Sequence, residues 1–557
     1  MWVDALPDEL KFYIDFGKVK LILARDQEQV DKLLKIKEDI PFVEKVIWWE
    51  PRGLNAPEYT DNPWLMSLDE LIQQGIQYEE NYPKLFDENI DQSKPEDIAF
   101  LYYTSGTTGV PKAVMRSSSS TLYTREQLRW FFPVIPGDDT ICYFQIATFA
   151  EPILGSVPHV TEGLILNFAE SPDTMQADLR EISPKCMFFF PRYWEDITTS
   201  IRSKVNDAGF LKRMTYNLCL PIGFKKADME MQGMSISPFW KALGKIAWWL
   251  AIRPSLDKVG LIRSKWGITG GYMLGMHNFR LMRALNMDLR QFFGATEQGT
   301  VAAHNPGDIR MDSVGNVIPN VEVRISETEE LIVRSQAVFE GYYNNPKATN
   351  DAFDKAGWFF TGDSAYLSEM GHLFFLDRAS ELRTLSTGQR FSPQYIEAQM
   401  RGGAYIRDCI TLGDENTDYV SVILIIDYQS VGDWAERKHI AFTTFADLSQ
   451  REEVGKLLLE DILRLNTTLP DYARIKRYVL LHKELDPDES ELTRTRKLKR
   501  TFVEERYGDI IRAIYGNKPT ALIEASVTYK DGRSATVKAE LRINKVEEEK
   551  ASTTQLN

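Results

Sequence analysis

The chain has 557 residues, more than one hydrophobic core usually holds, so we expect two or three domains. Hydrophobic residues make up 43% of it and charged residues 26%, which is ordinary for a globular protein in water. Its 66 basic and 80 acidic residues give a net charge of −14, which argues against general affinity for nucleic acids. The four cysteines and six histidines show no metal-ligand spacing, so we expect no zinc site built from them.

The first residues have neither the basic region nor the apolar core of a signal peptide. The longest apolar stretch, 246–252, is far shorter than the roughly 20 residues that span a bilayer. We expect it to form a buried helix face; the alternative is that its two tryptophans sit at a membrane interface. The expected location is the cytoplasm, with peripheral contact at the inner face of the membrane as the alternative.

Strand and helix patterns alternate in the first third of the chain. Residues 19–24 and 46–49 are typical of strands and 27–37 of a helix. A second helix over 67–82 begins with Ser67 as N-cap and Glu70 completing a capping box. This alternation predicts a parallel sheet covered by helices.

A loop rich in glycine and hydroxyl residues follows an apolar run, 97–103, that predicts a buried strand. Glycines let a backbone approach a phosphate, while hydroxyls, N–H groups and a lysine supply donors and charge. The lysine follows Val-Pro rather than glycine, so this is not a Walker loop. The sequence predicts a polyphosphate-binding loop with candidate residues Thr104, Ser105, Gly106, Thr107, Thr108, Gly109 and Lys112.

Further along, residues 265–271 predict a strand that enters a glycine turn at Gly270 and Gly271. A helix over 277–286 and a strand over 289–293 that ends at Gly294 follow. Ligands of parallel sheets gather at the carboxyl ends of strands, where we expect the turns near 106 and 294 to lie.

The chain becomes mostly strand from about 314, with examples at 321–325 and 330–334. A smaller α+β segment after Arg378 carries strands at 421–426 and 477–481. Alternating apolar residues over 522–543, on either side of Asp531 and Gly532, predict a β-hairpin. Residues 547–557 have the composition of a disordered tail.

Four motifs in order resemble those of the adenylate-forming superfamily, which includes acyl-CoA synthetases, luciferases and peptide-synthetase adenylation domains. Residues 103–112 resemble its phosphate-binding signature, and Gly-Ala-Thr-Glu at 294–297 its Tyr-Gly-x-Thr-Glu motif. Trp-Phe-Phe-Thr-Gly-Asp at 358–363 resembles its Trp-x-x-Thr-Gly-Asp motif. Residues 492–500 resemble the lysine motif of long-chain acyl-CoA synthetases. The segment 270–275, followed by 279–286, also resembles this long-chain branch more than the aryl or acetyl branches. The likeness runs from about residue 5 to about 515.

The resemblance implies α/β and α+β architecture: a large N-terminal domain of stacked α/β subdomains with a β-rich subdomain, followed by a small mobile α+β domain. We expect an AMP-binding domain over 1–378, a lid domain over 379–515, a hairpin extension over 516–545 and a tail over 546–557. It also implies two half-reactions. A carboxylate attacks the α-phosphorus of ATP to give acyl-AMP and pyrophosphate, and the thiol of coenzyme A then takes the acyl group.

The resemblance also assigns roles. The loop from Thr104 to Lys112 holds the β- and γ-phosphates, Glu297 helps to bind Mg²⁺ and Thr296 contacts the α-phosphate or the metal region. Lys497 stabilises the adenylation transition state, and Ser380 and Gly388 belong to the hinge and to coenzyme A contact. Asp363 accepts from the ribose hydroxyls and Arg378 contacts ribose or phosphate. The adenine and acyl-carbonyl region is flanked by Gly270, Gly271, Phe293 and Gly294.

Four features depart from the family pattern. Four serines, 117–120, replace a Thr-His-x-Asn-like segment, and Thr148 replaces a histidine associated with the acid substrate. Ser380 replaces an aspartate or lysine at the hinge, and family members usually carry roughly a hundred more residues before Leu6. We expect the first subdomain to expose apolar faces as a result.

The expected function is activation of a carboxylic acid, with a long-chain fatty acid as the first choice. We expect ATP binding to be retained while acyl specificity or turnover has changed. The alternatives are an aryl- or medium-chain acid CoA ligase and a catalytically weak nucleotide- or acyl-binding protein. The sequence indicates neither acyl chain length nor oligomeric state.

Overall fold

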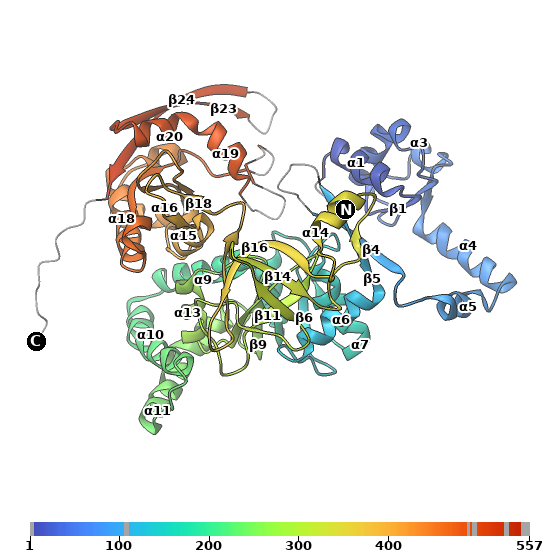
Figure 1. The fold of residues 1–557 in the computed structure, drawn as a ribbon, viewed down its shortest axis with the longest axis horizontal. Coiled ribbons are helices and arrows are strands. Elements are labelled where there is room, and N and C mark those ends of the chain that lie inside the picture. Colours follow the sequence, from blue (N-terminus) through green and yellow to red (C-terminus); the bar gives the residue numbers. More distant parts are fainter. Residues whose placement is uncertain are drawn as a thin grey trace, which may run out of the picture. The chain divides into compact units, whose positions relative to one another are not determined.

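The computed structural model describes residues 5–104, 111–486, 489, 491, 492, 498–528 and 534–546. The chain divides into two compact units, whose helices and strands are labelled in Figure 1. Unit 1 comprises Met1–Glu126, Phe144–Thr161 and Gln336–Asp351, and unit 2 comprises Gln127–Tyr143, Glu162–Ser335 and Ala352–Asn557.

Unit 1 begins with a three-stranded parallel sheet in the order β1-β2-β3, so the predicted parallel sheet is confirmed. The predicted capping box is also present, because Ser67 and Glu70 each accept the other's backbone N–H. Leu21 and Leu23 of β1 are exposed, as are Ile72 and Ile76 of α4. The elements are α1 (Pro7–Gly17), β1 (Leu21–Ala24), α2 (Gln27–Lys35), η1 (Lys37–Asp39), β2 (Lys45–Trp48), α3 (Pro57–Thr60), β3 (Leu65–Ser67), α4 (Leu68–Asn81) and α5 (Leu85–Gln92).

A second sheet of unit 1 has the order β15-β5-β4 and is antiparallel. The prediction of a buried strand over 97–103 is wrong, because β4 is the edge strand and only Tyr102 of it is buried. The remaining elements of unit 1 include the three strands of this sheet and the helices near them in sequence. They are β4 (Ile98–Thr104), β5 (Lys112–Ser117), α6 (Ser118–Arg129), η2 (Pro152–Ser156), α7 (Val157–Glu162), β15 (Gly341–Tyr342) and α14 (Pro346–Ala352).

Unit 2 contains a five-stranded sheet in the order β12-β11-β10-β9-β8. Strands β8, β9 and β10 are parallel, whereas β11 and β12 add antiparallel to them. A short parallel pair, β6 and β7, lies in the same unit. The strands are β6 (Asp139–Cys142), β7 (Ile165–Phe168), β8 (Cys186–Phe189), β9 (Trp266–Thr269), β10 (Leu289–Ala295), β11 (Gly299–Ala303) and β12 (Asn316–Val317).

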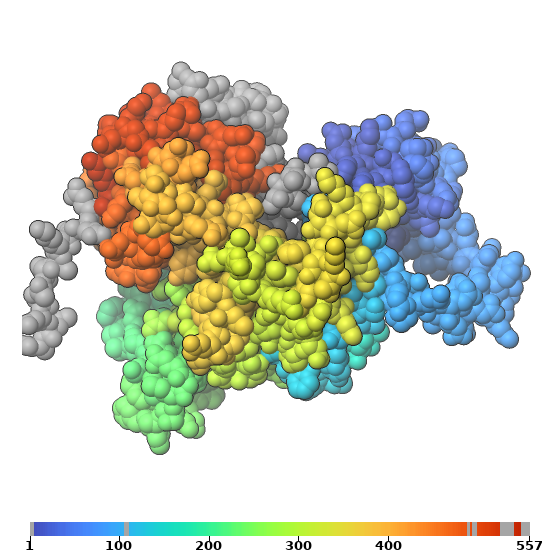
Figure 2. Space-filling view, in the orientation of Figure 1, coloured from blue at the N-terminus to red at the C-terminus, as the bar shows by residue number. Residues whose placement is uncertain are grey.

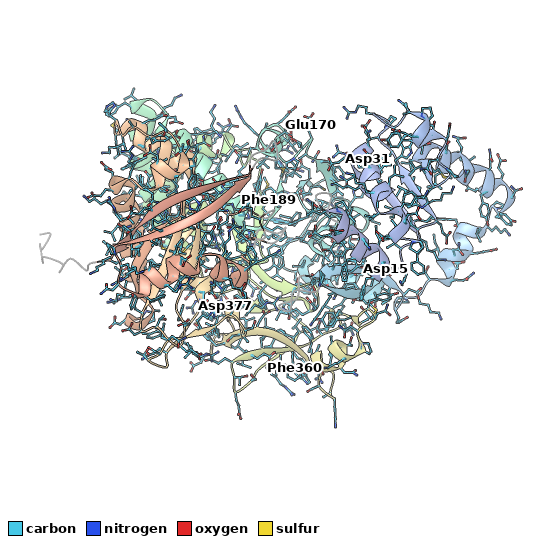
Figure 3. All side chains as sticks on the ribbon, turned by 90° about the horizontal axis from the view of Figure 1, so that it is seen from above. Asp15, Asp31, Glu170, Phe189, Phe360 and Asp377 are labelled. Carbon is cyan, nitrogen blue, oxygen red and sulfur yellow. The ribbon has the colours of Figure 1, made fainter. Side chains whose placement is uncertain are left out.

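Helices of unit 2 share a core with this sheet, in which Phe189 (labelled in Figure 3), Trp194 and Phe279 are buried. The predicted buried face at 246–252 is only partly correct, because Ala247, Ala251 and Ile252 are buried but the other large apolar side chains are not all covered. No helix in the described part of the chain is long and apolar enough to cross a membrane. The helices are α8 (Met175–Ile182), α9 (Pro191–Asn206), α10 (Phe210–Met231), α11 (Pro238–Ala247), η3 (Trp248–Ile252), α12 (Arg253–Asp257) and α13 (Met276–Ala284).

The strand-rich region predicted from about 314 forms a four-stranded antiparallel sheet in the order β13-β14-β16-β17. Its strands are β13 (Glu322–Ile325), β14 (Glu330–Arg334), β16 (Phe359–Leu367) and β17 (Leu373–Arg378).

A smaller C-terminal α+β domain follows, with a five-stranded sheet in the order β20-β21-β22-β24-β23. The predicted hairpin strands β23 and β24 pair antiparallel, and β24 joins the sheet through β22; the turn residues Asp531 and Gly532 and the tail 547–557 lie outside the described residues. The elements are β18 (Arg383–Thr384), β19 (Arg390–Phe391), α15 (Pro393–Met400), β20 (Ile406–Leu412), β21 (Val420–Ile426), α16 (Tyr428–Arg437), α17 (Phe445–Ser449), α18 (Glu452–Asn466), η4 (Asp471–Ala473), β22 (Ile475–Leu480), α19 (Arg500–Arg506), α20 (Gly508–Tyr515), β23 (Thr520–Thr528) and β24 (Ser534–Lys545).

A buried ion pair holds α19 against α15 in this domain. The Arg500 guanidinium donates to both carboxylate oxygens of Glu397, at 2.8 and 3.0 Å, and to Glu381 at 3.0 Å. Burial opposes the charge of Arg500, but Glu397 outweighs that effect, so the pKa of Arg500 is raised.

We predict that Glu397→Ala destabilises the protein by about 3–5 kcal/mol, because it leaves the Arg500 charge buried without its main partner. Urea unfolding followed by circular dichroism measures the loss. Glu452→Ala is the matched control, because Glu452 pairs with Lys456 at 2.8 Å on the exposed surface and its loss should leave unfolding unchanged. Equal unfolding of the two variants would contradict the prediction.

Candidate active site

The predicted phosphate-binding loop joins β4 to β5 in unit 1. Thr104 and Lys112 are register partners at its two ends, and the Thr104 hydroxyl donates to the Lys112 carbonyl at 3.5 Å. The Lys112 ammonium lies 4.8 Å from the centre of the Tyr342 ring on β15. We had expected this loop at the carboxyl end of a strand in a parallel sheet. It instead connects the two strands of an antiparallel β-hairpin. The remaining predicted residues lie outside the described part of the chain: Ser105, Gly106, Thr107, Thr108 and Gly109.

The serines that follow this hairpin are used in packing. The Arg116 guanidinium is buried and donates to the Ser120 carbonyl at 2.8 Å, to the Thr124 hydroxyl at 3.0 Å and to the Ala337 carbonyl at 2.5 Å. The Ser120 N–H donates to the Ser117 hydroxyl at 3.1 Å. The segment that departs from the family pattern at 117–120 thus lies beside a buried guanidinium inside unit 1, which it contacts through the Ser120 main-chain carbonyl.

Thr148, at the position expected for a histidine, is bonded within its own turn. Its hydroxyl donates to the Gln145 carbonyl at 2.8 Å. The next residue, Phe149, lies with its ring 4.4 Å below the Arg116 guanidinium and 5.6 Å from the Tyr102 ring. Thr148 is neutral, so it supplies no positive charge to a carboxylate.

In unit 2, glycines mark the carboxyl ends of two neighbouring parallel strands. β9 ends just before Gly270, where a Cβ would lie 2.5 Å from the Phe292 ring, and Gly271 has a φ of +93°. Gly294 lies inside β10 rather than in a turn, at an irregularity in its pairing with β11. A Cβ on Gly294 would lie 2.2 Å from the Gly299 carbonyl oxygen, so the close strand approach requires glycine.

The residues after β10 complete this edge of the sheet. Thr296 and Glu297 occupy the turn between β10 and β11, and both are half-buried. The described residues contain no group of three or more His, Cys, Asp or Glu side chains that could hold a metal ion. Mg²⁺ is commonly held by one or two carboxylates together with substrate phosphates, so Glu297 fits a metal that arrives with a nucleotide.

Two further predicted residues meet at the end of β16 and β17. Asp363 and Arg378 are register partners, and the Asp363 carboxylate accepts the Arg378 guanidinium at 3.1 Å. Asp363 is buried, whereas Arg378 is exposed. On the same strand as Arg378, the Phe375 ring lies 5.3 Å from the ring of Phe293 on β10. The structure thus joins Phe293, Asp363 and Arg378 through β17.

The start of the C-terminal domain is fixed by Asp377, which the sequence did not single out. Its buried carboxylate accepts the Ser392 hydroxyl at 2.8 Å and the Gln394 N–H at 3.2 Å, at the first turn of α15. Ser380 is exposed in the turn after β17, and Gly388 lies in an open turn between β18 and β19 with a φ of +86°. Lys497 lies outside the described residues.

A second contact of this domain within unit 2 was also missed. Glu195 on α9 is buried, with its oxygens 3.7 Å from the Arg192 guanidinium and 3.8 Å from that of Arg401. Burial raises the pKa of Glu195 against the influence of Arg401 and Arg192. Arg192 also donates to the Arg407 carbonyl at 2.9 Å. In sequence, these charges look like a solvated helix face.

Comparison with known proteins assigns both parts of the chain. The family model described as AMP-binding enzyme matches residues 3–343, and the model for the AMP-binding enzyme C-terminal domain matches 381–519. The chain belongs to the AMP-binding enzyme family. The match to the C-terminal domain begins three residues after Arg378, the last residue of β17.

Relatives of this chain include proteins named as fatty-acid–CoA ligases. A putative fatty-acid–CoA ligase, fadD11 of Mycobacterium tuberculosis, is 27% identical over 428 residues, covering 76% of this chain and 75% of that protein. The long-chain-fatty-acid–CoA ligase ACSBG1 of Rattus norvegicus is 24% identical over 547 residues, covering 92% of this chain and 74% of that protein.

Solved structures share the fold at low identity. The adenylation domain of a carboxylate reductase from Mycobacterium chelonae matches with a TM-score of 0.67 and 18% identity, covering 92% of this chain and 75% of that one. The anthranilate CoA ligase AuaEII, solved with anthranoyl-AMP, matches with a TM-score of 0.62 and 14% identity, covering 91% and 81%. These likenesses establish the adenylation fold.

We predict a pH-dependent contribution of Asp377 to stability. Burial raises the pKa of its carboxyl to about 6, so the folded chain holds this proton more tightly than the unfolded chain. Its contribution to the free energy of unfolding is therefore present near pH 4 and lost as the pH rises to about 6. Asp377→Asn removes this titration, so its stability relative to wild type should rise by about 2 kcal/mol between pH 4 and pH 7.

Urea unfolding at the two pH values measures this difference. The control is Asp471→Asn, whose side chain is 88% exposed and should give the wild-type pH dependence. A pH dependence for Asp377→Asn that matches wild type would contradict the assignment.

Proposed function

We propose that the chain is an acid–CoA ligase that activates a carboxylic acid with ATP and transfers the acyl group to coenzyme A. The acid's carboxylate attacks the α-phosphorus of ATP, giving acyl-AMP and pyrophosphate, and the coenzyme A thiol then displaces AMP. The observation that carries the proposal is the Asp363–Arg378 pair at the end of β17, in a chain that matches both family domains.

In this proposal the nucleotide contacts Asp363 of the Thr-Gly-Asp motif and residues near the Gly-Ala-Thr-Glu motif. The ribose hydroxyls donate to the Asp363 carboxylate, with Phe293, Gly270, Gly271 and Gly294 shaping the adenine and acyl-carbonyl region. Gly294 lets β10 approach β11 closely, because a Cβ there would lie 2.2 Å from the Gly299 carbonyl oxygen. Arg378, which is exposed, is then available to a ribose or phosphate oxygen on its solvent side.

The first step places negative charge on the phosphorus oxygens and on the leaving pyrophosphate. Cations and donors at fixed positions stabilise such charge more effectively than an acid or base would. We assign that role to the loop from Thr104 to Lys112, to Thr296 and to Lys497. Mg²⁺, when bound at Glu297, supplies further positive charge to the phosphates.

We also propose the domain limits 1–378, 379–515, 516–545 and 546–557, with Ser380 and Gly388 in the hinge and the coenzyme A contact. The exposed positions of Ser380 and Gly388 suit a turn that changes conformation between half-reactions.

We favour a long-chain fatty acid as the substrate, since the relatives in this group are named fatty-acid–CoA ligases. An aryl acid is the second candidate, because the fold is shared with a ligase solved with anthranoyl-AMP. The neutral Thr148 favours an acid held chiefly by its apolar part. The third candidate is a nucleotide- or acyl-binding protein with weak catalysis.

A pyrophosphate-release assay over fatty acids of increasing length and aryl acids, with ATP and Mg²⁺, tests the proposal. We expect release with long-chain fatty acids and none when Mg²⁺ is chelated. Release only with aryl or short acids would reassign the substrate. No release with any acid, from protein that still binds ATP, would overturn the ligase proposal.

We predict that Lys497→Ala lowers the adenylation rate by about 100-fold or more, since a transition-state cation is lost, while ATP binding persists. Lys499→Ala is the matched control, because Lys499 is an exposed lysine of the same basic run and should keep near wild-type activity. If Lys499→Ala lost activity and Lys497→Ala kept it, the lysine assignment would be wrong.

We predict that Asp363→Ala weakens AMP binding by about 10- to 100-fold, because charge-assisted hydrogen bonds to the ribose are lost. Isothermal titration calorimetry with AMP measures the effect. Asp312→Ala is the control, since Asp312 pairs with Arg310 at 3.2 Å on the surface of the same unit. Unchanged affinity of Asp363→Ala would exclude the ribose contact.

A further inference from the structure

An exposed apolar stripe runs along the helical segment formed by α11, η3 and the start of α12. Phe239, Ala242, Ile246, Trp249 and Leu250 are all exposed on it, with Trp249 66% exposed. Their spacing of three or four residues places them on one side of a helix. In Figure 2 the green surface of α10 and α11 stands out from the rest of unit 2.

The neighbouring helix α10 carries a second set of the same kind. Leu211, Met214 and Leu218 follow the i, i+3, i+7 spacing of one helix face, and all three are exposed. Large exposed apolar side chains that gather on adjacent elements mark a docking surface more often than a free one.

The opposite side of these helices is fixed in the core of unit 2. Ala247, Ala251 and Ile252 are buried together with Tyr216 and Cys219 of α10. These helices therefore already pack one apolar face into the core, and the exposed stripe is a second apolar face.

The segment that carries this surface has a positive net charge, unlike the chain as a whole. Between residues 232 and 256 the basic residues are Lys241, Lys245 and Arg253, all exposed, and there is no acidic residue. Over 210–256 there are 7 basic and 2 acidic residues, a net charge of +5, whereas the whole chain carries −14.

The two acidic residues of this region are already paired. Asp228 accepts the Arg280 guanidinium at 2.8 and 2.6 Å, and Glu230 lies 3.6 Å from the Lys226 ammonium. The Arg253 guanidinium lies 5.1 Å from the Trp249 ring, at the end of the stripe. Tryptophan beside arginine and lysine is the combination that favours the boundary between lipid headgroups and acyl chains.

We propose that the apolar stripe and its lysines dock this protein on an anionic lipid bilayer. Trp249, Leu250, Ile246 and Phe239 enter the headgroup boundary, while Lys241, Lys245 and Arg253 face the anionic headgroups. A protein partner is the less favoured occupant, because the stripe offers lipid-like apolar side chains and cations but no carboxylate to select a partner. The inference does not depend on the proposed function.

The test is co-sedimentation of the full chain with vesicles of phosphatidylcholine alone and of phosphatidylcholine mixed with phosphatidylglycerol. We expect binding to the anionic vesicles that weakens at high salt, because part of the attraction is electrostatic. The double variant W249Q/L250Q should lower the partition coefficient by about tenfold or more, and K241E/K245E should remove the preference for phosphatidylglycerol. Thermal unfolding checks that these exposed changes leave the fold intact.

Trp130→Gln is the matched control, because Trp130 is 73% exposed and lies outside the two helices. It should bind vesicles as wild type does. The proposal is overturned if wild type stays in the supernatant with both vesicle types, or if W249Q/L250Q binds as wild type. Sedimentation velocity of wild type and W249Q/L250Q tests the alternative occupant. If wild type does not bind vesicles but self-associates, and W249Q/L250Q does not self-associate, a second copy covers the stripe and the proposal is overturned.

Discussion

The carboxyl end of β17 carries two neighbouring charged side chains with different partners. Arg378 pairs with Asp363 across to β16, and Asp377 accepts the hydroxyl and N–H groups that begin α15. Successive side chains of a strand point to opposite faces, so one strand end serves the candidate nucleotide site on one side and the C-terminal domain on the other. Movement at this point would affect both, which suits an enzyme with two half-reactions.

The departures from the family pattern fall into two kinds once the structure is considered. Ser117 and Ser120 belong to the buried surroundings of Arg116, so their effect is on packing in unit 1. Thr148 replaces the histidine of the family pattern, and its hydroxyl donates to the Gln145 carbonyl of its own turn. The nucleotide-motif residues match the family pattern in sequence, whereas Thr148 is neutral where the resemblance predicts a histidine.

Much of the fold could be predicted because local patterns agree with the final structure. The capping box at Ser67 and the strands near Gly270 and Gly294 depend on neighbouring residues. The edge position of β4 could not be predicted, because the other side of β5 is taken by β15, which lies more than two hundred residues away. Glu195 and Asp377 were missed because part of their surroundings is not local: Arg401 lies about two hundred residues after Glu195, and Asp377 accepts from Ser392 and Gln394 at the start of the next long helix. The apolar run at 246–252 predicted a helix correctly. It did not indicate which side of that helix packs into the core, so the exposure of Trp249 could not be predicted.

Direct detection of the intermediate tests the central claim, that this chain makes an acyl-adenylate. The protein is incubated with ATP, Mg²⁺ and palmitate without coenzyme A, and the quenched mixture is analysed by mass spectrometry. The account predicts palmitoyl-AMP, replaced by palmitoyl-CoA and free AMP when coenzyme A is added. If neither palmitate nor any other acid gave an adenylate, while calorimetry showed that ATP binds, the chain would be a nucleotide-binding protein and the account would be contradicted.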